Sequence, residues 1–539
     1  MLLSANDFKI RGGMKLIWVI TLSLLAVVAC AWDVELVRNW SLGGHGMSAT
    51  GIFDLDGDSV PEILIPGNSR LYCYDAAGNE RWSFTPTSHY FPAVSSPAVA
   101  DIDHNGTLEV VFSTPAAVYA LTPDASPVWS RALAGEGSVQ NCISSVALGD
   151  VNQDGLLEVF AYEVYASRLL CLNPVNGDTI WSYLPEGNLY FSVGTPTIAD
   201  VNLDGSLEVL GQVAFNGGGG RLYCLKASGE ERWHYDTPGS GIGGWQLASA
   251  AVADLNNDES LEVVTTANYW GIVCLSSGGR ELWRRSISQH AASYPAIADL
   301  DGDDTLEIVV ALGPSMKCFS GPTGRDKWSF TVDSGYYIVS SPALCDLDGD
   351  GRLEVLFAEV KQNNPADPNR PMWILNALGQ PLWHDTTGTT MSDPTCGDLN
   401  QDGRMEFLIG PTMRSGNCYW FQVDTIALPT GAIPWPTLQH DIWRTGWYEY
   451  FGPPVGINEP EKEHSQFAAL VRASPNPFVA KVNLSAPADV NWLTVYDATG
   501  RTVATLRMNK GRTTWEAKGI GPGVYFCPNR GSTLRLVKM

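Results

Sequence analysis

A nine-residue segment occurs eight times in this chain of 539 residues, and its repetition limits the fold more than any other feature. DLDGDSVPE at Asp54 and DVNLDGSLE at Asp200 are two of the copies, which follow one another at intervals of 45 to 54 residues. A short β-prone run comes after each copy. Units of about 50 residues with several short strands and no helical period are typical of propeller blades. The sequence therefore predicts an all-β, eight-bladed β-propeller, with seven blades and an irregular segment as the alternative.

A tryptophan recurs with the same period. It follows an apolar strand and a turn that contains Gly or Pro, as in LYCLKASGEERW, which ends at Trp233. One further tryptophan, Trp40, precedes the first nonapeptide. We expect its strand to complete the last blade and close the ring, because closure removes exposed strand edges. The periodic series is Trp82, Trp129, Trp181, Trp233, Trp283, Trp328, Trp383 and Trp435.

The nonapeptide carries oxygen-bearing side chains at fixed positions: Asp at 1, Asp or Asn at 3 and 5, and Glu at 9. Alternating oxygen ligands on a tight loop, completed by a later carboxylate, suit Ca²⁺, which accepts six to eight oxygens in irregular geometry. We therefore expect several structural calcium ions. The predicted metal ligands are Asp54, Asp56, Asp58, Glu62, Asp101, Asp103, Asn105, Glu109, Asp150, Asn152, Asp154, Glu158, Asp200, Asn202, Asp204, Glu208, Asp254, Asn256, Asp258, Glu262, Asp299, Asp301, Asp303, Glu307, Asp346, Asp348, Asp350, Glu354, Asp398, Asn400, Asp402 and Glu406.

The other nonapeptide positions indicate how the loop is held. Positions 2 and 8 are apolar in every copy, and we expect them to fix the loop to the blade core. Position 6 is Gly in five copies, as expected where the backbone adopts a positive φ. Glu259 fits that conformation worst, so we expect the fifth site to bind its ion most weakly.

The charge of the chain also favours bound cations. The eight nonapeptides hold 29 of the 58 acidic residues, and like charges this close need a counterion. Eight calcium ions would change the formal charge from −24 to −8. Acidic turns that cap strands without any metal are the alternative. The same acidic excess excludes a nucleic-acid binder, which needs a basic surface.

These loops resemble the calcium-binding repeats of the FG-GAP and VCBS families, which include integrin alpha-chain propellers and bacterial surface proteins. The tryptophan elements are similar to the repeat of quinoprotein propellers. Together the two resemblances cover residues 32–449 and imply a calcium-binding propeller over that range. PWPTLQHDIWRTG, from Pro434, also resembles the closing segment of such bacterial propellers.

The first 31 residues have the pattern of a signal peptide. Leu16 to Ala29 are apolar apart from two hydroxyl residues, follow Lys15, and are too short to span a bilayer. Met14 is the better start of this signal, and cleavage after Ala31 matches an A-x-A site. Lipidation of Cys30 is the alternative. We expect a mature chain without a transmembrane segment, secreted or on the outer surface of a bacterium.

The end of the chain forms two further regions. Residues 450–467 read as a solvated linker, and residues 468–539 show the alternation of a small β-sandwich. SPNPF, VYDATGR and GPGVY, in that order, resemble the type A C-terminal sorting domain of the type IX secretion system. The resemblance implies that the secretion machinery is a partner of this domain. A small accessory sandwich is the alternative.

The sequence favours a binding module over an enzyme without excluding an enzyme. It contains no HExxH, GxSxG or phosphate-binding loop, and the adjacent cysteine pair of quinoprotein dehydrogenases is absent. We expect a non-catalytic binding or adhesion module for an extracellular glycan or protein. The alternative is a calcium-dependent, lyase-like propeller that degrades polysaccharide. Exposed aromatic residues can stack on sugar rings, and packing between blades is the other explanation for them. The candidate ligand-binding residues are Tyr90, Phe91, Tyr190, Phe191, Trp245, Tyr294, Tyr336 and Tyr337.

Overall fold

A computed structural model describes most of residues 34–423 and seven strands between 472 and 538. The N-terminal 33 residues and residues 424–471 lie outside the described part, so the predicted signal peptide, linker and closing segment with Trp435 fall there. Within 34–423 the gaps are 43–47, 59, 68, 87–93, 135–143, 188, 190–193, 217, 238–247, 268–269, 287–292, 304, 339, 362–371, 386–391, 401, 403 and 411–416.

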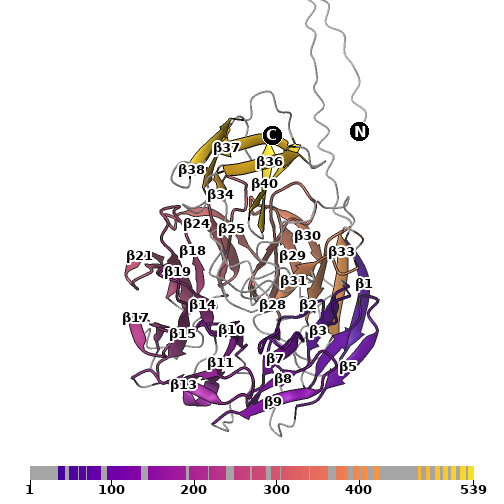
Figure 1. Cartoon of the computed structure of the whole chain (residues 1–539). Coiled ribbons are helices and arrows are strands. Elements are labelled where there is room, and N and C mark those ends of the chain that lie inside the picture. Colours follow the sequence, from indigo (N-terminus) through magenta and orange to yellow (C-terminus); the bar gives the residue numbers. More distant parts are fainter. Residues whose placement is uncertain are drawn as a thin grey trace, which may run out of the picture.

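Eight antiparallel sheets follow one another around a ring, and the predicted eight-bladed propeller is confirmed (Figure 1). Each blade begins with a short strand at the axis and ends with an outer strand. Blade 1 contains β2 (Gly51–Phe53), β3 (Glu62–Pro66), β4 (Leu71–Tyr74) and β5 (Glu80–Phe84), and blade 2 contains β6 (Ala98–Ala100), β7 (Glu109–Ser113), β8 (Ala117–Leu121) and β9 (Pro127–Ala132). Blade 3 contains β10 (Ala147–Gly149), β11 (Glu158–Glu163), β12 (Arg168–Leu172) and β13 (Thr179–Tyr183), and blade 4 contains β14 (Thr197–Ala199), β15 (Glu208–Ala214), β16 (Gly220–Leu225) and β17 (Glu231–Thr237).

The last four blades repeat this pattern with two variations. Blade 7 gains an extra strand, and blade 8 takes its outer strand from the other end of the propeller. These blades are β18 (Ala251–Ala253), β19 (Glu262–Ala267), β20 (Gly271–Ser276), β21 (Glu281–Arg285); β22 (Ala296–Ala298), β23 (Glu307–Leu312), β24 (Ser315–Ser320), β25 (Asp326–Thr331); β27 (Ala343–Cys345), β28 (Glu354–Lys361), β29 (Met372–Leu375), β30 (Pro381–Asp385) with β26 (Tyr336–Ile338); and β31 (Pro394–Gly397), β32 (Glu406–Ile409), β33 (Asn417–Val423) with β1 (Val34–Ser41).

The ring closes as the extra tryptophan predicts. β1 pairs antiparallel with β33, with Trp40 opposite Cys418, so a strand from the start of the propeller completes blade 8. Trp40 is buried and its ring stacks on that of Trp420 at a centroid distance of 6.1 Å. Blade 8 therefore has its fourth strand, and the sheet edge that β33 would otherwise expose is covered.

The inner strands contact one another around the axis. β10 meets β14, β22 meets β27, and β31 meets β2 across the closure. Hydroxyl side chains join them: the backbone N–H of Ala49 donates to Ser96 Oγ at 2.8 Å, and Thr395 Oγ1 donates to the carbonyl of Thr50 at 3.0 Å. Because these bonds run from one blade to the next, the polar start of each inner strand is satisfied by its neighbour.

Seven of the eight outer-strand tryptophans donate an indole hydrogen bond to the following blade, a contact that we call the tryptophan clasp. The Trp181 ring lies against Gly229, which has a φ of 80°. A Cβ atom at this position would lie only 2.7 Å from the indole. The Trp181 Nε1 donates to the carbonyl of Ala227 in the same turn at 2.9 Å. Equivalent indole-to-carbonyl bonds span 2.6 to 3.2 Å at Trp40, Trp82, Trp129, Trp233, Trp283 and Trp328. These seven tryptophans are thus contacts between blades.

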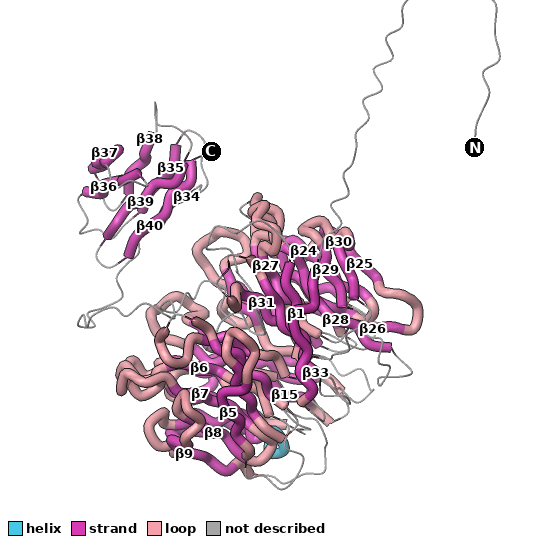
Figure 2. The backbone as a smooth tube through the Cα atoms, turned by 90° about the vertical axis from the view of Figure 1, so that its right-hand side faces the viewer, coloured by secondary structure: helices cyan, strands magenta, loops and turns pink. Residues whose placement is uncertain are grey.

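The described C-terminal strands form two antiparallel sheets (Figure 2). β36, whose last three residues begin VYDATGR, pairs antiparallel with β37. One sheet contains β34 (Arg472–Ser474), β35 (Lys481–Ser485) and β38 (Arg512–Glu516), and the other contains β36 (Trp492–Asp497), β37 (Thr502–Arg507), β39 (Gly523–Asn529) and β40 (Ser532–Lys538).

Helix is almost absent from the described residues. The short 3₁₀ turn η1 (Val164–Ala166) is the one helical element there. Within the part of the chain that the structure describes, no helix has the length and apolar character needed to cross a bilayer.

The tryptophan clasp can be tested with two glycine substitutions. Gly229 and Gly335 both have a positive φ, but a Cβ at Gly229 would meet Trp181 at 2.7 Å, whereas nothing lies within 4 Å of one at Gly335. We expect Gly335→Ala to cost about 1–2 kcal/mol from backbone strain alone. We expect Gly229→Ala to cost about 2–4 kcal/mol, because the indole must also move. Denaturant unfolding followed by tryptophan fluorescence measures both, and equal losses would contradict the clasp.

Candidate metal centres

The eight nonapeptides occupy one face of the propeller. We number them loops 1 to 8 after their blades; each joins the first strand of its blade to the second. Because the strands are antiparallel, the turn between the third and fourth strands lies at this end of the blade too. The turn between the second and third strands, and the connection to the next blade, lie at the opposite end. The structure thus separates a loop face from a connection face.

The Glu at position 9 is a buried clamp in all eight loops. One carboxylate oxygen, Oε2, accepts a hydrogen bond from the backbone N–H of position 2 at 2.7 to 3.1 Å. The eight side chains are at most 4% exposed. A charge-assisted bond to a backbone N–H closes the loop at its base. The second oxygen, Oε1, is left for other partners.

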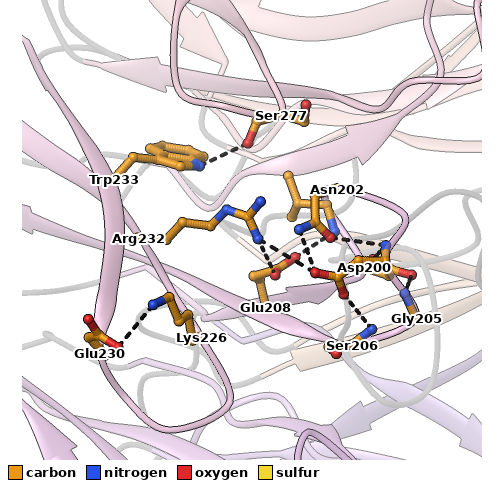
Figure 3. A network of polar contacts seen from close by, with 12 residues as sticks. Asp200, Asn202, Gly205, Ser206, Glu208, Lys226, Glu230, Arg232, Trp233 and Ser277 are labelled. Carbon is orange, nitrogen blue, oxygen red and sulfur yellow. Dashed lines mark hydrogen bonds and ion pairs between the residues drawn. The ribbon is translucent and has the colours of Figure 1, made fainter.

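The Asp and Asn side chains fold the loop backbone around themselves. In loop 3, Asp150 accepts N–H bonds from Asp154 at 3.1 Å and from Gly155 at 3.0 Å, and Asn152 Oδ1 accepts one from Asp154 at 2.8 Å. Loop 4 repeats this pattern around Asp200 (Figure 3). These contacts also fit the alternative of acidic turns without metal, so hydrogen bonding inside the loops does not identify an ion.

Backbone conformation agrees with the pattern at position 6 and adds position 4. Gly106, Gly155, Gly205 and Gly351 have φ between 85° and 90°, and Glu259 adopts a φ of 67° in their place. Position 4 is also left-handed, although its residues differ in type. Its φ values run from 55° to 76° in His104, Gln153, Leu203, Asn257, Gly57, Gly302 and Gly349. The sequence reasoning missed position 4, because Gly occupies it in only three copies.

The apolar positions hold the loops as expected. Position 2 is at most 4% exposed in all eight copies, from Leu55 to Leu399. Position 8 is buried or half-buried from Pro61 to Met405. The backbone between these two anchors stands away from the core, and this places the oxygens of positions 3 and 5 at the surface.

Carboxylates converge closely enough for one ion in four loops. One oxygen from each of three residues lies within 4.8 Å of the others in loop 1 (Asp54, Asp56, Asp58), loop 2 (Asp101, Asp103, Glu109), loop 6 (Asp299, Asp301, Asp303) and loop 7 (Asp346, Asp348, Glu354). Carboxylate oxygens are among the ligands that Ca²⁺ prefers, and carbonyl oxygens and water complete its coordination in proteins. Glu109 Oε1 is buried and has no hydrogen-bond partner among the described residues, and this orphaned acceptor fits a bound cation.

Burial raises the pKa of these glutamates. The pKa rises from 4.5 to about 9 for Glu354, to about 8 for Glu406 and to about 7 for Glu158, chiefly by loss of hydration and further by the nearby aspartates. A buried carboxylate without a full counter-charge prefers its neutral form. The ion-free loops therefore contain carboxylates that take up protons near neutral pH.

Three cationic side chains that the sequence reasoning missed reach into loops. Arg81 Nη1 lies 2.5 Å from Glu62 Oε1, Arg232 Nη1 lies 2.8 Å from Glu208 Oε1 (Figure 3), and Lys327 Nζ lies 2.6 Å from Glu307 Oε1. Each stands directly before its blade's tryptophan. That position is apolar in four of the other blades, so aligning the repeats would have marked these three cations as exceptions.

The candidate ligand-binding aromatics are only partly described. Tyr90, Phe91, Tyr190, Phe191 and Trp245 lie outside the described residues. Tyr294, Tyr336 and Tyr337 are half-buried. Each belongs to a connection that leads to an inner strand, and therefore to the connection face.

Two of these tyrosines contact neighbouring blades. Tyr294 hydrogen-bonds through its side chain to Ser249, and its backbone N–H donates to Ser341 Oγ at 3.2 Å. Tyr336 pairs with Lys361 across β26 and β28 and packs against the core between blades 6 and 7. Packing between blades therefore accounts for part of both side chains.

Comparison with known proteins supports the repeat and the fold. Residues 54–112, which include loops 1 and 2, match the FG-GAP-like repeat family. The fold is similar to the quinohemoprotein alcohol dehydrogenase of Comamonas testosteroni, at 11% identity over 75% of this chain and 79% of that one, with a TM-score of 0.53. It is also similar to the exotype rhamnogalacturonan lyase YesX, at 16% identity over 79% and 83%, with a TM-score of 0.50. At these identities the likeness concerns the fold alone. No curated protein matches the chain significantly.

The raised pKa values predict a pH dependence of stability. For a carboxyl whose folded pKa exceeds its unfolded value, the native state binds more protons, so stability falls as pH rises through the folded pKa. In chelator we therefore expect the melting temperature to fall between pH 5.5 and pH 9, over the window set by Glu158 and Glu354. Calcium should remove this fall, because the ion competes with protons for the same oxygens. Glu354→Gln should remove the upper part of this fall, near pH 9, because the glutamates with lower pKa values still titrate. A melting temperature that rises with pH in chelator would contradict this account.

Proposed function

We propose that this chain is a secreted or cell-surface, calcium-stabilised β-propeller that acts as a non-catalytic binding module. The observation that carries the proposal is the buried Glu that closes each of the eight loops through Oε2, together with the unpartnered Oε1 of Glu109, which is available to a cation. A carboxylate buried without a counter-charge is costly, and an ion offsets that cost. Most of the calcium ions in this proposal are structural.

The connection face is the proposed binding surface. In the sequence, the aromatic candidates belong to the connections between blades, and each connection precedes the inner strand of the next blade. Tyr336 and Tyr337 lie on β26, an added strand that fixes one such connection against β28. Half-buried aromatic rings on an ordered support can stack on sugar rings at low entropic cost. A glycan is therefore the ligand we test first, and a protein partner is the alternative.

Export through the type IX secretion machinery is the second part of the proposal. It rests on the order of the SPNPF, VYDATGR and GPGVY segments, together with two described antiparallel sheets over the same residues. The proposal assigns residues 1–31 to a signal peptide, 32–449 to the propeller, 450–467 to a linker and 468–539 to the sorting domain.

Chelation tests the metal part of the proposal. We expect removal of calcium from the purified propeller at pH 8 to lower its melting temperature by at least 10 °C, because tight binding to the native state alone stabilises it in proportion to the logarithm of ion concentration. Differential scanning calorimetry with and without chelator measures the change. Readdition of calcium should restore the melt, and magnesium, which demands stricter geometry, should restore it less. A melt unaffected by chelation would refute structural calcium.

A polysaccharide panel tests the binding part. We expect the calcium-loaded propeller to be retained on an insoluble glycan without releasing soluble products. Trp245→Ala and Tyr337→Ala should each reduce retention about tenfold, the scale of one lost stacking contact. Val175→Ala is the matched control, because Val175 is an exposed apolar residue in a turn on the loop face.

The other outcomes of the panel separate the alternatives. Unsaturated products in the soluble fraction would replace the binding module with the polysaccharide-degrading enzyme. Neither retention nor products, followed by capture of a protein ligand through the same face, would favour adhesion to protein.

A further inference from the structure

The residue before each tryptophan occupies a β-bulge. In blade 4, Cys224 pairs with Trp233 while Leu225 pairs with Glu231, so Arg232 is the extra, unpaired residue. The same shift occurs in blades 1 to 3 and 5 to 7. A bulge re-aims the side chain that it leaves unpaired. The bulge residues are Arg81, Val128, Ile180, Arg232, Leu282, Lys327 and Leu382 in blades 1 to 7.

In blades 1, 4 and 6 the bulge residue is a cation that occupies the free oxygen of the clamp. Besides Glu62, Arg81 contacts Asp56 Oδ2 at 2.9 Å. Lys327 contacts Asp301 Oδ2 at 3.1 Å besides Glu307. Arg232 bonds to Glu208, and Asp204 Oδ2 lies 4.0 Å away. These amino and guanidinium groups thus contact the position 9 Glu and one further carboxylate of the same loop. A divalent ion in the loop would bind the same carboxylates.

In blades 2 and 7 the bulge residue is apolar and the Glu has no such partner. Val128 is 38% exposed, and Glu109 Oε1 beside it lacks a hydrogen bond within the described residues. The clusters of converging oxygens differ accordingly. Glu109 and Glu354 belong to the clusters of loops 2 and 7, whereas the clusters of loops 1 and 6 contain aspartates only. The presence of the cation therefore coincides with withdrawal of the Glu from the cluster.

In loops 3, 5 and 8, neutral amide side chains donate hydrogen bonds to the position 9 Glu. Asn152 Nδ2 donates to Glu158 Oε1 at 2.7 Å, and Asn256 Nδ2 donates to Glu262 Oε1 at 3.1 Å. In loop 8, Gln422 Nε2 donates to Glu406 Oε1 at 2.9 Å. An amide carries no net charge, and rotating it about its terminal bond offers an oxygen instead. These contacts do not compete with a divalent ion as a fixed positive charge does.

We propose that Arg81, Arg232 and Lys327 are built-in cations that take the place of a metal ion at the position 9 Glu, so that the propeller binds divalent cations at loops 2, 3, 5, 7 and 8 and not at loops 1, 4 and 6. The inference rests on the proposed calcium binding and deepens it, because it assigns the ions to particular blades. It also ranks the sites by charge.

Loop 7 is the strongest site in this ranking and loop 4 the least able to bind. Loop 7 has four carboxylates, Asp346, Asp348, Asp350 and Glu354, and no bulge cation. Loop 4 has three, because Asn202 stands at position 3, and Arg232 cancels one of their charges. The expectation that loop 5 is weakest rests on backbone strain and stays a prediction: Glu259 adopts the left-handed conformation, with a φ of 67°.

Exchange of bulge residues between blades tests the proposal. Arg232→Leu gives blade 4 the residue of blade 5, and Val128→Arg gives blade 2 the residue type of blade 1. We expect Arg232→Leu to bind one calcium ion more than the wild type, and Val128→Arg one fewer. Native mass spectrometry and equilibrium dialysis with calcium count the ions. Leu184→Arg is the control, because it adds the same charge away from the loops. Leu184 follows β13 at the connection face and is 50% exposed.

Melting temperatures supply a second readout. In chelator, Arg232→Leu should melt below the wild type, because Glu208 loses its counter-charge, and calcium should restore it to the wild-type value. A wild type that binds calcium, with unchanged counts in both variants, would overturn the inference and leave the proposed function standing. A wild type that binds no calcium would overturn both. An Arg232→Leu variant that calcium does not rescue would also overturn the inference.

Discussion

The architecture depends on contacts that each blade can make only with its neighbours. A four-stranded sheet has two faces to bury, and in a ring both faces pack on adjacent blades. Five outer-strand indoles fix this packing at the rim, since each ring lies on a glycine of the next blade and each N–H donates to a carbonyl there: Trp129, Trp181, Trp233, Trp283 and Trp328. Near the axis, hydroxyl side chains make a second set of bonds between inner strands. A blade is thus held at both its inner and outer ends, and the repeat length of about 50 residues follows from the four strands needed to span that distance.

The loops raise an electrostatic problem, and we propose that the same repeat solves it in two ways. Each buries a Glu at its base and gathers further carboxylates nearby, so every loop needs positive charge. A side chain supplied by the bulge is always present and costs no separate binding step, whereas an ion is exchanged with the surroundings. The bulge position is well suited to this choice. Val128, Ile180 and Leu282 face solvent at this position, so a change to a cation in those blades leaves the core untouched. One repeat can therefore vary its dependence on metal blade by blade.

Much of the fold could be predicted from the sequence, because repetition makes weak local signals add up. Eight Asp-to-Glu nonapeptides and the period of tryptophans predicted the blades, and Trp40 predicted the closing strand, which the pairing with β33 confirms. The site was predicted less completely. Which residues converge depends on β-bulges, and a bulge at Arg232 or Lys327 has no sequence mark apart from the tryptophan that follows. Residues such as Leu203 and Gln153 hid the left-handed turn at position 4, because side-chain hydrogen bonds impose it without glycine. The ligand-binding candidates, such as Trp245, lie in connections whose conformation no periodicity specifies.

The pairing of β1 with β33 has a consequence for the order in which the propeller folds. Trp40 and Cys418 lie opposite each other in the finished sheet, although almost the whole propeller separates them in the chain. Seven blades can assemble from neighbouring segments as the polypeptide emerges, but the eighth waits for both ends. Contacts between distant segments form late, since the closure of a long loop comes before any stabilisation from them. An unclosed ring exposes the edge of β33 and the flank of blade 1, and exposed strand edges invite association with other chains. Closure therefore comes last in assembly, and it removes β1 and the edge of β33 from pairing with another copy.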